Sequence, residues 1–152
     1  MGIAEFAFGV AASLLANVIQ SITTKSTINY FQQRRLDNRI DEAISMVIEP
    51  MLTSLQREGI PEEMQIFLME VCEEELHPIA NDPQRLFEGS LNGQKIFDQF
   101  YENGALPERI TQAGLSETYA IIFPRIATLL CKVPVAVKDW ESNAWAENFK
   151  RL

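Results

Sequence analysis

The chain has 152 residues, of which 47% are hydrophobic and 22% are charged, and its net charge is −8. A chain of this length and apolar content can bury a hydrophobic core, which argues against intrinsic disorder. The acidic excess argues against nucleic acid as a partner, because phosphate backbones are bound mainly through lysine and arginine. We therefore expect a single domain over residues 1–152 that binds no nucleic acid.

Apolar residues recur every three or four positions along most of the chain, which predicts an all-α fold. Runs of alternating apolar and polar residues, which are typical of strands, never persist for long. We expect a compact bundle of four to six main helices with short connecting helices. The expected helices cover residues 3–35, 37–58, 62–76, 84–89, 93–102, 116–130 and 135–152, with a short turn over 107–113.

Glycine, proline and asparagine set the expected helix boundaries. Gly59 ends the second helix, and Pro61 opens the third with acidic residues in its first turn. His77 and Pro78 stop the third helix, because the residue before a proline avoids helical geometry. Asn92 starts the helix over 93–102, since its side chain can cap exposed backbone N–H groups.

The last expected helix has no stop signal. After Trp140, Trp145 and Phe149 the helical pattern runs to the final residue without a glycine or a proline. A native C-terminus that frays fits this pattern, and so does a domain cut from a longer chain. We expect this to be the N-terminal domain of a longer chain.

The two cysteines, Cys72 and Cys131, lie far apart, each within an apolar stretch. Two thiols in a chain of this size do not make a disulfide scaffold. We expect buried free thiols in a reducing compartment, and therefore a cytoplasmic domain.

No pattern of catalytic or metal-binding residues stands out. Glu74 and His77 have the Glu-x-x-His spacing of di-metal bundles, but such a site needs a second copy and the chain has one histidine. Residues 89–95 depart from a phosphate-binding loop in glycine spacing, and Ile96 replaces the required Ser or Thr. We expect no catalytic residue, no metal and no cofactor. A carboxylate pair acting in acid–base chemistry is the enzyme alternative.

Residues 6–19 are almost all apolar, and no lysine or arginine precedes them as in a signal peptide. About 14 apolar residues are fewer than a spanning helix needs, so we do not expect a constitutive anchor. The pattern alone favours a core helix of the bundle. The other interpretation is a helix that leaves the bundle for a membrane or an oligomer. Its small or polar side chains gather on one face, which holds Glu5, Gly9, Ser13, Ala16 and Gln20.

The opening segment AEFAFGVAASLLAN, residues 4–17, resembles the start of helical domains at the N-termini of bacterial, notably cyanobacterial, STAND NTPases. These are NLR-like proteins with a NACHT or NB-ARC NTPase domain. The closing segment resembles the helix that leads out of such a domain. The closing residues that carry this likeness are Trp140, Trp145, Asn148, Phe149, Arg151 and Leu152.

The resemblance implies a non-enzymatic cell-death or antiphage effector, similar in logic to fungal HeLo, bacterial Bell and plant coiled-coil immune domains. In those domains the first helix of a bundle disrupts membranes. An attached C-terminal NTPase domain would drive self-association and bring several first helices to an anionic membrane. The residues that the resemblance assigns to membrane contact are Ile3, Phe6, Phe8, Val10, Leu14, Leu15, Val18 and Ile19.

The alternative function is an adaptor or oligomerisation domain that recruits a separate effector through helix–helix contacts. It fits the uneven distribution of charge along the chain. Residues 61–121 carry three Lys and Arg against twelve Asp and Glu, whereas the segments on either side are nearly balanced.

Overall fold

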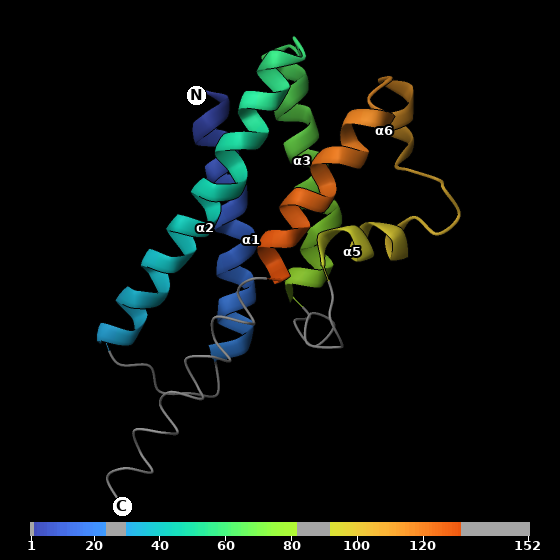
Figure 1. The fold of residues 1–152 in the computed structure, drawn as a ribbon. Helices are drawn as coiled ribbons and strands as arrows, with labels where there is room; N and C mark the ends of the chain where they lie inside the picture. The colour runs from blue at the N-terminus through green and yellow to red at the C-terminus, as the bar shows by residue number, and fades with distance from the viewer. Residues whose placement is uncertain (1, 24–29, 82–91, 132–152) are drawn as a thin grey trace, which may run out of the picture.

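The computed structural model describes residues 2–23, 30–81 and 92–131, and these residues form an all-α bundle (Figure 1). The described part of the chain contains no strand. The expected helices over 84–89 and 135–152 lie outside the described residues. The helices are α1 (Ile3–Thr23), α2 (Tyr30–Arg57), α3 (Glu62–Asn81), α5 (Gly93–Phe100), α6 (Glu108–Gln112) and an unlabelled helix over residues 116–131.

The prediction of one helix over residues 3–35 is wrong. Helix α1 is Ile3–Thr23 and α2 begins at Tyr30, so residues 30–35 belong to the second helix. The two helices run in opposite directions in Figure 1, as two neighbours packed in a bundle can and a single continuous helix cannot.

The prediction that the third helix stops at His77 is also wrong, because α3 continues through Pro78 to Asn81. A proline inside a helix removes one hydrogen bond and crowds the preceding turn. Here the last turn is held by tertiary contacts, since the side chains of Leu76, Ile79 and Ala80 are buried. Pro50 likewise lies inside α2.

The glycine and asparagine signals are confirmed. Gly59 and Gly114 have φ angles of 74° and 71°, in the left-handed region where glycine has no steric penalty, and they follow α2 and α6. The side chain of Asn92 accepts a hydrogen bond from the Lys95 backbone N–H at 2.9 Å and so caps α5.

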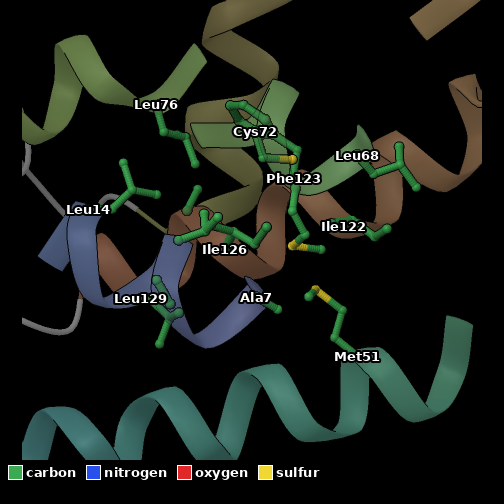
Figure 2. Packing of buried hydrophobic residues seen from close by; sticks show 14 of the residues in the cluster. Ala7, Leu14, Met51, Leu68, Cys72, Leu76, Ile122, Phe123, Ile126 and Leu129 are labelled. Carbon is green, nitrogen blue, oxygen red and sulfur yellow. The ribbon is translucent and has the colours of Figure 1, made fainter. Parts of the chain in front are cut away.

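One hydrophobic core joins the long helices. In Figure 1 α1 crosses behind α2, and its second half lies between α2 and α3; it packs against both. Figure 2 shows how side chains from these helices and from the 116–131 helix meet. The labelled residues are Ala7 and Leu14 of α1, Met51 of α2, Leu68, Cys72 and Leu76 of α3, and Ile122, Phe123, Ile126 and Leu129 of the 116–131 helix.

A cluster of aromatic rings joins α5 to the 116–131 helix. The centroid of the Phe123 ring lies 5.7 Å from that of Phe97 and 5.6 Å from that of Phe100, in tilted geometry. Tyr101 and Tyr119 complete the cluster, and Tyr119 is fully buried. These rings, together with the buried side chain of Ile96, attach the eight-residue helix α5 to the bundle.

Candidate functional site

Helix α1 is the candidate functional element. Among the described residues, it is the one helix long and apolar enough to cross a membrane by length and composition alone. The relevant window, Ile3–Gln20, has 18 residues and a mean hydropathy of 1.5. Core helices of soluble proteins share this length and composition, and 39% of the window is buried within the bundle. Length and composition therefore do not decide between the two interpretations of this helix.

Most of the residues predicted to contact a membrane face the interior of the bundle. Their side chains therefore reach lipid only if α1 leaves its neighbours. Sequence reasoning omitted Ala7 and Ala11, which are 0% and 1% exposed and let α1 approach the adjacent helices closely. The buried members of the predicted set are Ile3, Val10, Leu14, Leu15 and Val18, and the partly buried members are Phe6, Phe8 and Ile19.

The outer face of α1 carries small and uncharged side chains in its middle. The predicted small or polar face is confirmed, since all five of its residues, from Glu5 to Gln20, are exposed. Ala12 is exposed on the same side. A Cβ atom added at Gly9 would meet nothing within 4 Å. Along this face the one charge is that of Glu5, in the first turn.

The N-terminus of α1 is attached to the start of α3. The backbone N–H of Ile3 donates a hydrogen bond to Oε1 of Glu62 at 2.9 Å. Glu62 lies in the first turn of α3, so its carboxylate serves the N-terminal ends of two helices. A hydrogen bond to an ionised acceptor is stronger than one between neutral groups, and this one fixes the position of α1 along α3.

Helix α3 is strongly acidic. Its sequence contains six glutamates and no lysine or arginine. On α6, Nη2 of Arg109 lies 2.6 Å from Oε2 of Glu74 and 3.9 Å from Oε1 of Glu75. The hydrogen bond to Glu74, together with the charges of both glutamates, raises the pKa of Arg109. Side chains this exposed form ion pairs that contribute little stability.

The Glu74 and His77 pair does not meet further ligands in the described residues. Within those residues no group of three or more His, Cys, Asp or Glu side chains is placed to hold a metal ion. Glu74 pairs with Arg109 instead. The other weak motif, residues 89–95, overlaps the first turn of α5, and its first three residues lie outside the described chain.

Both cysteines are free thiols, as predicted. Cys72 is fully buried, and burial raises its pKa far above the ordinary value. Cys131 is half-buried rather than buried, and desolvation raises its pKa to about 11. A thiol acts as a nucleophile through its thiolate form, so neither residue is prepared for covalent chemistry near neutral pH.

Tyr101, at the C-terminal end of α5, contacts Tyr119 of the 116–131 helix through its hydroxyl group. The hydroxyl oxygens of Tyr101 and Tyr119 lie 2.6 Å apart, within hydrogen-bonding distance. Burial raises the pKa of Tyr101 to about 12, partly offset by the hydrogen bond from its partner. Burial also raises the pKa of Tyr119, and the hydrogen bond to Tyr101 adds to that increase. Both side chains stay neutral near pH 7, and their role is to join α5 to the core.

The raised pKa values predict a loss of stability in alkaline solution. Below pH 10 these tyrosines are protonated in both the folded and the unfolded chain, and they add no pH dependence. Above pH 10 the unfolded chain loses these protons first, so the free energy of unfolding should fall as the pH rises towards 12. The measurement is urea unfolding across this range, for the natural chain and for the double variant Tyr101→Phe, Tyr119→Phe.

The double variant should show a shallower decline than the natural chain between pH 10 and pH 12. A Tyr30→Phe variant removes a tyrosine that does not belong to the pair and serves as the control. If the natural chain and the double variant lose stability in parallel, the two hydroxyls do not titrate as described.

Sequence reasoning missed a groove on the surface of α2. The groove lies beside Met46 and Pro50 and continues to Arg125 of the 116–131 helix. The available signal was Met46, a large apolar residue of α2 whose side chain is 70% exposed. A single residue of this kind is common on protein surfaces and predicts no site.

Comparison of this chain with protein-family models, with curated proteins and with solved structures finds no match.

Proposed function

We propose that this domain is a non-enzymatic effector of cell death or antiphage defence, whose helix α1 enters a membrane when several copies are brought together. The observation that carries the proposal is the composition of α1. It is apolar over a length suited to a bilayer, and its outer face bears no charge beyond the first turn. The likeness of residues 4–17 to the first helix of STAND-linked domains supports the same reading.

The length of α1 suits a bilayer. At about 1.5 Å per residue, the 18-residue window extends about 27 Å, close to the hydrocarbon thickness of about 30 Å. Its backbone hydrogen bonds are satisfied within the helix, as a hydrocarbon environment requires. Glu5 lies near one end of the window, where its carboxylate can remain in the headgroup region.

The buried face of α1 explains why association should be needed. Removing α1 from the bundle exposes side chains such as Leu14 and Leu15, each worth about 1.5–3 kcal/mol of burial. It also uncovers the matching surface of α3, so a single copy keeps its helix docked. Lipid replaces the lost contacts of α1, and contacts between copies offset the remaining cost. An attached NTPase domain is the partner we propose for assembling the copies.

A second function is favoured by the surface of α3. Six glutamates on one helix of a domain form an acidic surface that suits a basic protein partner. An adaptor that recruits a separate effector would use this surface and leave α1 inside the bundle. The two functions make different predictions about which residues activity requires. The membrane function requires α1, and the adaptor function requires the glutamates of α3.

The membrane function predicts that a charge in the middle of α1 blocks activity without unfolding the domain. Ser13 is exposed and lies near the centre of the window, so Ser13→Glu should leave the bundle intact. In a bilayer the same carboxylate costs about 2.5–3.5 kcal/mol at the centre of a spanning helix. With the chain fused to a forced oligomeriser, dye leakage from anionic liposomes should fall at least tenfold for this variant.

The matched control is Ala4→Glu, which adds the same charge to an exposed position at the end of the same helix. This variant should retain leakage, because its carboxylate stays near the headgroups. Circular dichroism confirms that both variants are folded. Equal leakage from the natural and Ser13→Glu oligomers would contradict insertion of α1. No leakage from a verified natural oligomer would favour the adaptor function.

A further inference from the structure

The groove on α2 combines exposed apolar surface with positive charge. Between α2 and the 116–131 helix it has a volume of about 270 Å³ and is lined by Met46, Val47, Pro50, Arg125 and Thr128. A wider part, of about 710 Å³, follows the outer surface of α2 as far as Arg57. Arg125 is the charged residue of the narrower part, whereas Arg57 and Glu49 both line the wider part.

The groove is also open to polar contact with the backbone. Pro50 has no N–H group, so it cannot donate the helical hydrogen bond that the Met46 carbonyl would receive in a regular helix. On the 116–131 helix, Ile121 and Arg125 are four residues apart and both are exposed, so they lie on one face, and Arg125 lines the groove. A binding partner would find apolar contacts, a carbonyl acceptor and a cation side by side.

The complementary surface lies on the chain itself, along the outer face of α3. Glu63, Phe67 and Glu70 follow one another at helical spacing, with both glutamates exposed and Phe67 half-buried. Met64 beside them is 42% exposed. This face therefore offers large apolar side chains between carboxylates. Its apolar side chains and carboxylates are complementary to the apolar residues and the arginines of the groove.

We propose that the α2 groove binds the outer face of α3 from a second copy of this chain. Met64 or Phe67 fills the apolar part of the groove, and Glu70 lies opposite Arg125. Because the two surfaces share no residue, one contact leaves a groove free on one copy and an α3 face free on the other. This self-association is independent of any entry of α1 into a membrane.

Electrostatics favour this arrangement over contacts between like surfaces. Two α3 faces repel each other, since each presents the exposed carboxylates of Glu63 and Glu70. The groove is the place where exposed Arg125 meets apolar surface. An association led by such charges weakens as salt is added, because the exposed charges are screened.

The test is sedimentation velocity of the full chain over a concentration series, with single and paired charge reversals. Arg125→Glu and Glu70→Arg should each raise the dissociation constant of self-association at least tenfold. The chain with both reversals should recover an affinity near that of the natural chain, since each surface again meets its opposite. A 1:1 mixture of the two single variants should also associate like the natural chain, because the groove of each variant meets the opposite charge on the α3 face of the other.

Arg39→Glu and Glu42→Arg make the same charge changes at exposed positions of α2 outside the groove, and both should associate normally. A natural chain that stays monomeric throughout would overturn the proposal. So would single variants that associate like the natural chain, which is the result expected if residues 132–152 or another protein occupy the groove. Failure of the paired reversal to restore association would also overturn it.

Discussion

Replacing Phe123 by alanine should lower the free energy of unfolding by about 3–5 kcal/mol, the range expected for truncating a buried aromatic side chain. Phe123 is fully buried, and its ring lies 5.6 Å from that of Tyr101 and 5.4 Å from that of Tyr119. Its removal leaves a cavity at the point where α5 joins the 116–131 helix. Urea unfolding followed by circular dichroism measures the change.

Ile121→Ala is the matched control for this truncation. Ile121 lies two residues away on the same helix and is 47% exposed, so its loss should change the free energy of unfolding by no more than about 0.5 kcal/mol. Similar effects from the two variants would mean that the aromatic cluster does not hold the helices together.

The same substitution, glycine to alanine, should have opposite effects at two helical positions. At Gly93 a Cβ atom would overlap the backbone carbonyl oxygen of Pro124 and the hydroxyl oxygen of Thr128. The carbonyl is part of a buried helix and cannot move aside, so Gly93→Ala should destabilise the domain by about 1–3 kcal/mol or more. At Gly9 the added atom meets open space, and Gly9→Ala should stabilise the domain by up to about 1 kcal/mol.

Thermal and urea unfolding of the two variants provide the comparison, and the natural chain is the common reference. Each variant serves as the control for the other, because the chemical change is identical. A stable Gly93→Ala variant would show that α5 does not pack against the 116–131 helix as closely as described.

The all-α fold class and the outward face of α1 could be predicted from the sequence, because both depend on local spacing. A helix with Glu5, Gly9, Ser13 and Gln20 on one side has little reason to bury that side, and the structure confirms the prediction. The helix cap formed by Asn92 could also be predicted, because it joins residues only three positions apart.

The errors concern places where tertiary contacts overrode the local pattern. Pro78 is a strong local signal for a helix end, but burial of the side chains beyond it holds the last turn of α3. The close approach of Gly93 to Pro124 and Thr128 joins residues about thirty positions apart, which spacing along the chain cannot reveal. The same limit applies to the α2 groove, whose two sides come from separate helices.

The apolar residues assigned to a membrane illustrate a different limit. A side chain such as Val18 or Leu15 is equally suited to a protein core and to lipid, so composition identifies the helix and not its surroundings. The structure places these residues against α2 and α3, and only an experiment on assembled copies tests whether they reach lipid.

The hydrogen bond between Ile3 and Glu62 has a consequence for how the sequence of α1 could change during evolution. Its donor is a main-chain N–H, which every residue except proline supplies, so the bond does not depend on the side chain at position 3. The alignment of α1 at this end is therefore encoded in α3. Substitutions on the exposed face of α1 can accumulate without shifting the helix along its neighbour. The outer face of α1 can therefore vary in sequence while its buried side chains and this one hydrogen bond keep the helix in place.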